Sequence, residues 1–127
     1  MTPQELRDRL TAFAVACIAL CGELGHHPQG RRIADQLSDS ATSTAANYRA
    51  ACRARSRREF LAKLGIALEE ADETVGWLDI VVRSKIAGEE RTAELRREAN
   101  EVLAILAKSR STALRNEQKR RNDLDPR

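Results

Sequence analysis

Apolar side chains recur along the chain at alternating intervals of three and four residues, the spacing of an amphipathic α-helix. Four such stripes are present, and no stretch shows the strict alternation of a half-buried β-strand. We therefore predict four helices. Their inward-facing residues are Leu6, Leu10, Phe13, Cys17, Leu20 and Leu24; Ile33, Leu37, Ala41, Ala45, Tyr48 and Cys52; Phe60, Leu64, Leu68, Ala71, Val75, Leu78 and Val82; and Leu95, Ala99, Val102, Leu106 and Ala113.

Capping signals place the boundaries of these helices. Thr2, followed by proline and then Glu5, has the pattern of a capping box at the start of the first helix. Gly25 ends that helix, and we expect a loop over 26–30 before a second helix that runs to about residue 52. Ser56 and Glu59 form a second capping-box pattern, so the third helix starts near Ser56. Gly88 marks the turn into the last helix, which we expect to end near residue 115.

Short connections between these helices predict an antiparallel up-down four-helix bundle, an all-α fold in one domain over residues 1–115. Residues 116–127 are polar, charged and basic, and we expect this C-terminal tail to fray. Aromatic residues make up only 3% of the 127 residues, so the core has few bulky side chains. A thin core of this kind favours subunit association, which buries more apolar area.

The third helix carries a second apolar group that falls well away from its inward face. Ile66, Trp77 and Ile80 lie on its acidic side, and Gly65 and Gly76 share nearly one azimuth beside them. Glycine inside a helix costs about 1 kcal/mol relative to alanine, so two in line suggest close backbone approach. We interpret these five residues as a subunit interface. The alternative is that they are the scattered exposed apolar residues found on any protein.

Charge is distributed unevenly, although the net charge is only +3 and the pI about 9.0. Residues 28–58 contain seven Arg and Lys against two acids, and residues 91–127 contain ten against six. Residues 59–90 have the opposite balance, with three basic residues against eight acids. Basic patches of this kind suit phosphates or acidic partners.

Two arginine-rich clusters are the candidate binding residues. The first is Arg49, Arg53, Arg55, Arg57 and Arg58, and the second is Arg110, Arg115, Lys119, Arg120 and Arg121. Guanidinium groups bind phosphate in a bidentate way, and such surfaces bind nucleic acid largely through counterion release. The aromatic side chains look internal, so binding is expected to follow the backbone with little sequence selectivity. The alternative is that these arginines pair with acids of a neighbouring subunit or partner.

No pattern in the sequence indicates an enzyme, a metal site or a cofactor site. The acids Glu69, Glu70, Asp72 and Glu73 lack the Glu-x-x-His pairs of di-iron bundles. Cys17, Cys21, His26 and His27 match none of the usual zinc spacings, and two of them belong to or adjoin the inward stripe. A glycine-rich phosphate loop is also missing. We therefore predict no catalytic residues, no metal and no cofactor.

The cysteines and the longest apolar run indicate the cellular compartment in which the protein is expected. Three cysteines among small or apolar helical residues read as reduced intracellular thiols. The run over 12–22 is too short to span a bilayer, and its flanks do not resemble a signal peptide. We expect a cytoplasmic protein without a membrane partner.

Several segments taken together resemble one bacterial family. They are 33–47, 53–67, 70–78 and 98–103, and they include the runs Arg-Ser-x-x-Glu-Phe and Glu-Ala-x-Glu-Thr-x-x-Trp-Leu. With these segments the chain resembles the 23S ribosomal RNA intervening-sequence protein family over roughly residues 6–115. The resemblance implies a cytoplasmic four-helix bundle that assembles as a homopentameric ring.

The resemblance also extends to the accessory protein of diversity-generating retroelements. That relation implies binding of RNA or DNA, with a nucleic-acid enzyme such as a reverse transcriptase as a partner. Some family members have Asn-Ile-Ala-Glu-Gly where this chain has Asn-Tyr-Arg-Ala-Ala at 47–51, so the local charge here is more basic. The family implies no catalytic residues. We therefore expect a non-enzymatic homo-oligomer that binds nucleic-acid backbone, with a protein–protein adaptor or scaffold as the alternative.

Overall fold

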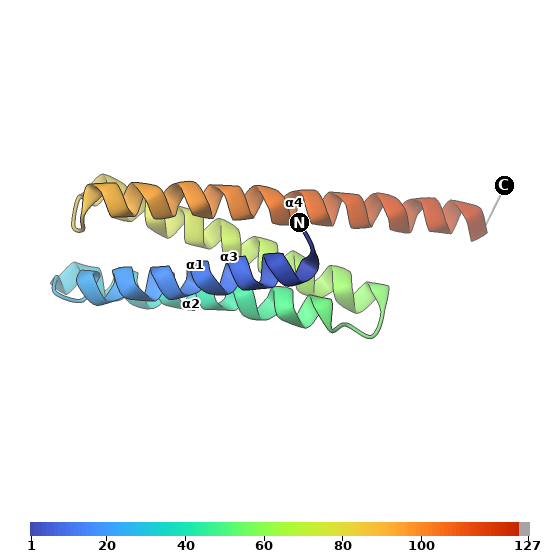
Figure 1. The fold of residues 1–127 in the computed structure, drawn as a ribbon, viewed down its shortest axis with the longest axis horizontal. Helices are drawn as coiled ribbons and strands as arrows, with labels where there is room; N and C mark the ends of the chain where they lie inside the picture. The colour runs from blue at the N-terminus through green and yellow to red at the C-terminus, as the bar shows by residue number, and fades with distance from the viewer. Residues whose placement is uncertain (125–127) are drawn as a thin grey trace.

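A computed structural model describes residues 1–124, and these form four helices with no strand among them. The helices are α1 (Pro3–Leu24), α2 (Pro28–Cys52), α3 (Arg57–Ser84) and α4 (Glu89–Leu124). Successive helices run in opposite directions and are joined by short loops (Figure 1). The predicted all-α antiparallel four-helix bundle is therefore confirmed.

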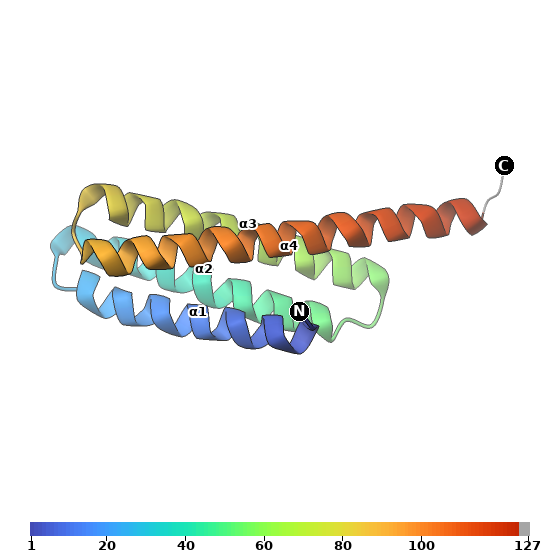
Figure 2. The ribbon, with the colours of Figure 1, turned by 45° about the horizontal axis from the view of Figure 1, so that its top comes forward.

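The helices do not contact one another equally. α2 packs extensively against both α1 and α3, and α3 also packs against α4, whereas α1 and α4 share the least extensive contact. α4 is the longest helix and continues past the end of the bundle (Figure 2). The bundle is consequently well packed along three of its seams and loosely joined along the fourth, between α1 and α4.

The core follows the predicted stripe completely on α1 and in part on the other helices: Ile33, Ala45 and Cys52 of α2 are only half-buried, and Val82 and Ala113 lie outside the core. All six predicted positions of α1 are buried, and leucines from every helix meet them, each contributing about 1.5–3 kcal/mol by its burial. α2 contributes mainly small side chains, which lets its neighbours approach closely; its buried residues are Gly30, Ala34, Leu37, Ser40, Ala41, Thr44, Tyr48 and Ala51. The Thr74 hydroxyl of α3 donates to Ser40 Oγ across 2.9 Å, and Ser40 donates to the Leu37 carbonyl. This buried chain of hydrogen bonds joins α2 to α3.

The first loop is shorter than the sequence predicts. α2 begins at Pro28 rather than after Gly30, because proline fits the first turn of a helix, where its missing N–H is not needed. Gly30 is therefore buried inside the first turn of α2 instead of lying in the loop. A Cβ at this position would lie 2.0 Å from the Leu24 carbonyl oxygen, so the turn between α1 and α2 requires glycine.

The predicted end of the last helix is also wrong. α4 does not end near Arg115 but continues to Leu124, while residues 125–127 of the expected tail lie outside the described residues. The segment from Arg115 onward contains good helix formers and no glycine or proline before residue 126, so nothing in its local chemistry stops the helix. Beyond Leu106, however, no described residue of α4 is buried.

Ion pairs close the α1–α4 seam. Arg9 of α1 donates to both carboxylate oxygens of Glu98, at 2.7 and 2.9 Å, and lies 2.9 Å from Glu101. These hydrogen bonds raise the pKa of Arg9 above its ordinary value. Nearer the other end of the seam, Glu23 accepts from the Gly88 backbone N–H at 3.1 Å and lies 3.4 Å from Arg91.

Gly30→Ala and Gly22→Ala should change stability in opposite directions. The new Cβ at residue 30 collides with backbone, so we expect a loss of about 2 kcal/mol or more in the free energy of unfolding. Gly22 lies inside α1, and no atom lies within 4 Å of the place that an alanine Cβ would occupy, so alanine there should add about 0.5–1 kcal/mol. Urea unfolding of both variants checks this, and equal effects would contradict the described turn.

Arg9→Ala should destabilise the protein by about 1 kcal/mol, because it removes the bidentate pair that joins α1 to α4. Amide hydrogen exchange should rise mainly in these two helices. Arg97→Ala is the matched control: Arg97 is exposed on α4 beside the same seam and forms no ion pair among residues 1–124. If both variants behave alike, the Arg9 ion pairs are not what holds the seam.

Candidate nucleic-acid interface

Four arginines gather where α2 ends. Arg49 and Arg53 lie one helical turn apart and line a groove of about 460 Å³ that Arg7 of α1 also lines. A second groove, of about 520 Å³, shares Arg49 and Arg53 and adds Arg55 from the loop between α2 and α3. We call Arg7, Arg49, Arg53 and Arg55 the junction arginines. Three of them belong to the predicted first cluster, and Arg7 joins them only through the fold.

The junction arginines have no acidic partner among residues 1–124. None of the ion pairs within this part of the chain includes them, and Arg7 donates only to the amide oxygen of Gln4. A guanidinium at the surface that pairs with no carboxylate keeps its donors available to an external acceptor. The two grooves therefore present several guanidinium groups that form no ion pair among the described residues, although Asp8 lines the first groove and Glu59 the second.

The start of α3 fixes the position of Arg55. The Glu59 N–H donates to Ser56 Oγ at 3.0 Å, as the predicted cap requires. The Glu59 carboxylate accepts instead from the Arg55 backbone N–H at 3.1 Å, so the reciprocal bond of the capping box is displaced by one residue. Arg57 and Arg58 occupy the first turn of α3, where the positive end of the helix dipole disfavours cations. This costly placement concentrates positive potential at the junction.

Two of the predicted arginines face an internal acid. Arg57 lies 3.9 Å from Glu117 of α4, and Arg121 lies 3.8 Å from the same carboxylate. Both arginines remain more than half exposed, so these pairs are weak. The Arg57–Glu117 pair nevertheless connects the start of α3 to the far part of α4, which distinguishes Arg57 from the junction arginines; the Arg121–Glu117 pair lies within α4.

The second predicted cluster lies on the part of α4 beyond its last buried residue, residues 107–124, which we call the α4 extension. It carries Arg110, Arg115, Lys119, Arg120 and Arg121, all exposed. The α4 extension and the loop between α2 and α3 lie at the same end of the bundle (Figure 1). The fold therefore brings both predicted clusters to one end of the molecule, on different elements.

The five residues of the predicted subunit interface do not share one environment. Ile66 and Ile80 are exposed, at 39% and 46%. Gly76 is open to its surroundings, whereas a Cβ on Gly65 would lie 3.7 Å from Arg110 Nε of α4. Trp77 is half-buried against the core of its own chain, which corrects the expectation that it lies well away from the inward face. Helical spacing alone places residue 77 outside the inward face of α3, but the large indole ring reaches the core from there. The subunit contact itself stays a prediction.

The cysteines and histidines considered as a zinc site differ in how far they are exposed to solvent. Cys17 is fully buried, and its burial raises the pKa of its thiol to about 12, while His26 and His27 are exposed. Across residues 1–124, no three His, Cys, Asp or Glu side chains gather so that they could hold a metal ion. Burial also raises the pKa of Tyr48 to about 12, and the neighbouring Cys52 adds to this shift.

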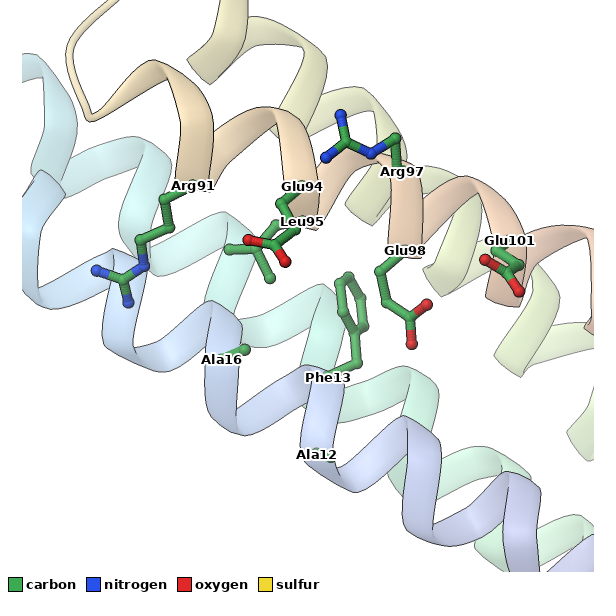
Figure 3. Close-up of a pocket in the computed structure, with 9 residues that line it drawn as sticks. All are labelled: Ala12, Phe13, Ala16, Arg91, Glu94, Leu95, Arg97, Glu98 and Glu101. Atoms are coloured by element: carbon green, nitrogen blue, oxygen red, sulfur yellow. The ribbon is translucent and has the colours of Figure 1, made fainter.

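The charge-free stretch of α1 borders a groove that the sequence analysis did not predict. Ala12, Phe13 and Ala16 form one wall of this groove, which has a volume of about 610 Å³ along the α1–α4 seam. Glu98 and Arg91 reach from α4 towards α1 at its rim (Figure 3). The run of uncharged residues over 12–22 is the signal that could have located this groove.

None of the four described helices has the length and apolar character needed to cross a membrane.

Comparison with known proteins places the chain. The family model described as 23S rRNA-intervening sequence protein matches residues 5–108. The chain is also similar to a crystal structure of a protein of unknown function from the S23 ribosomal protein family of Bacteroides thetaiotaomicron VPI-5482. That similarity has a TM-score of 0.77 and 31% sequence identity, and it covers 83% of this chain and 97% of the other. No curated protein matches. The chain therefore belongs to the 23S rRNA-intervening sequence protein family.

Proposed function

We propose that this protein is a non-enzymatic, homo-oligomeric bundle that binds the phosphate backbone of nucleic acid through its junction arginines. The observation that carries the proposal is that four guanidinium groups from α1, α2 and the following loop line two grooves without any ion pair among residues 1–124. Guanidinium forks match phosphate oxygens bidentately. Arg58 is exposed in the first turn of α3 and adds to the same positive region.

The aromatic residues support recognition of backbone rather than of bases. Phe13 and Tyr48 are buried, and Phe60 and Trp77 are half-buried against the core. Binding of single strands without sequence preference usually depends on exposed rings on which bases stack. The described residues present no fully exposed Phe, Tyr or Trp ring, and the exposed His26 and His27 lie at the end of the bundle opposite the junction arginines. A duplex, whose phosphates are displayed at regular spacing on its outside, is therefore the ligand that suits this surface best.

Self-association is the second part of the proposal. Its support is the exposed apolar residues, which include Val15 and Ile18 on α1 as well as Ile66 and Ile80 on α3. The family resemblance adds the expectation of a pentamer. An oligomer that presents one set of junction arginines per subunit multiplies weak phosphate contacts, since linked sites bind with higher avidity than single ones.

An adaptor or scaffold is the competing function, and Glu117 is the observation that favours it. This carboxylate draws Arg57 and Arg121 into ion pairs within the chain, so some arginines of this surface already pair with a protein acid and could pair with acids of a partner in the same way. The junction arginines differ from these two because they form no ion pair with any acid among residues 1–124. The two functions therefore predict different behaviour for the same protein in the presence of nucleic acid.

Reversing three junction arginines, Arg49→Glu, Arg53→Glu and Arg55→Glu together, should weaken binding to a 20-base-pair RNA duplex on the order of 100-fold at low salt. Each substitution removes a phosphate contact and adds repulsion. The dependence of log affinity on log salt should become shallower by roughly three, about one for each lost phosphate. Fluorescence anisotropy over a salt series measures both quantities.

The control for this experiment changes the same amount of charge elsewhere. Arg32→Glu, Arg83→Glu and Lys85→Glu alter three exposed basic residues near the opposite end of the bundle. This variant should bind the duplex within a few-fold of wild type. Equal losses of affinity in both variants would mean that only net charge matters. An unchanged affinity in the junction variant would show that the junction arginines are not the binding site.

A further inference from the structure

An acidic face on α3 has no basic partner within the described chain. Glu69, Glu70, Asp72 and Glu73 lie within little more than one turn, and none of them enters an ion pair among residues 1–124. Burial raises the pKa of Glu70, and the surrounding carboxylates, which include Asp39 of α2, raise it further. We call these five acids the acidic face. Their mutual repulsion disfavours the isolated chain.

Exposed apolar residues flank this acidic face on both sides. Ile66 is 39% exposed before the acids and Ile80 is 46% exposed after them. Gly76 lies between the acids and Ile80, and no atom lies within 4 Å of the position of a Cβ on it, so another helix meets no side chain there. The charge of this surface is complementary to that of a basic helix, and the apolar residue at each end gives such a helix an apolar contact.

The α4 extension has the complementary chemistry. It carries the five basic residues of the second cluster and an exposed leucine, Leu114, which is 42% exposed. Its first part, up to Glu117, borders α1, α2 and the start of α3, whereas every residue over 118–124 is exposed. A helix of this length without a packed face is only marginally stable in water, so its helical state favours a partner that covers it.

The two surfaces match in length, and within one chain the α4 extension runs away from the acidic face: Arg110 Nε lies 3.7 Å from the position of a Cβ on Gly65, and Glu117 approaches Arg57 nearer the start of α3. The α4 extension from Arg110 to Leu124 and the α3 segment from Ile66 to Ile80 each span about 21 Å at 1.5 Å per residue. The acidic face lies further along α3 than Gly65, towards Asp39 of α2. The partner of each surface must therefore come from another molecule.

We propose that the α4 extension of one molecule docks on the acidic face of a second copy of this chain. Arg115 and Lys119, one turn apart, then lie opposite Glu69 and Glu73, which are also one turn apart, and Leu114 contacts one of the exposed isoleucines. The contact joins two different surfaces, so each copy offers one of each to its neighbours. Repetition of such a contact produces a closed ring or a filament.

This inference rests on the self-association in the proposed function but not on nucleic-acid binding. It assigns the second basic cluster to assembly and leaves the junction arginines to the nucleic acid. The experiment is therefore carried out without nucleic acid, so that its failure says nothing about the junction arginines. The mass of the full-length protein is measured by sedimentation velocity across protein concentration and salt.

Two charge reversals and their combination test the docking. Glu69→Lys with Glu73→Lys, and separately Arg115→Glu with Lys119→Glu, should each raise the concentration at which the oligomer dissociates by at least about tenfold, a coupling typical of close charge pairs. Combining all four substitutions should restore assembly towards that of wild type. Glu90→Lys with Glu94→Lys is the control, because it reverses an exposed pair with the same spacing on another surface.

Three results would overturn the proposal: a wild-type protein that stays monomeric, an acidic-face variant that assembles like wild type, or a combined variant that fails to reassemble. Circular dichroism confirms that each variant keeps its helices. Should the acidic-face reversal fail to fold, Glu69→Gln with Glu73→Gln provides a neutral replacement. That replacement should also weaken assembly, and normal assembly by it would equally overturn the proposal.

Discussion

The close packing of α2 between α1 and α3 is the constraint on which the rest of the structure depends. Small side chains on α2, among them Ala34, Ala41 and Ala51, allow both neighbours to approach, and the buried Thr74–Ser40 hydrogen bond ties α2 to α3. A hydroxyl pair in an apolar core is costly unless both groups are satisfied, so it fixes the register of these two helices. The antiparallel packing of α1 on the other side of α2 brings the end of α2 beside the start of α1, where Arg7 joins Arg49 and Arg53.

The same packing leaves α4 as the least constrained helix. It rests on α3 along its first half and is joined to α1 mainly by the Arg9 and Glu23 ion pairs. Its second half leaves the bundle with most of its charged side chains in solvent. The molecule thus has two basic regions of different kinds. One is held rigidly in grooves between packed helices, and the other lies on a helix with little support. A rigid set of guanidinium groups suits a phosphate backbone, while an unsupported helix suits a protein surface that completes its packing.

Much of the fold could be predicted from the sequence because helical periodicity is a local property. The stripe from Leu6 to Leu24 and the Ser56 cap both follow from spacing alone, and both are present. The start of α2 differs from the prediction because proline is compatible both with a loop and with the first turn of a helix, and at Pro28 it begins the helix. The end of α4 differs because its last turns have no apolar stripe, although nothing in them breaks a helix.

Less of the candidate site could be predicted from the sequence, because its residues lie far apart along the chain. Arg7 is more than forty positions from Arg49, and only the pairing of α1 with α2 brings the two together. The pairing of Arg57 with Glu117 likewise depends on how α3 meets α4. Trp77 shows a further limit. A large ring can reach the core from the edge of a helix, so its azimuth alone did not determine its burial.

Nucleic-acid binding and the adaptor function are separated by the affinity of the wild-type protein for a duplex and for a single strand of the same RNA. Both affinities are measured over a salt series, with the mass of the protein recorded in each buffer. We expect tighter binding to the duplex than to the single strand, by an oligomer that stays intact. The affinity should fall steeply with salt: log affinity against log salt concentration should have a slope of about four in magnitude for each subunit that engages its four junction arginines. An intact oligomer that binds neither RNA at low salt would contradict the account, and the adaptor function would then be the better explanation of these arginines.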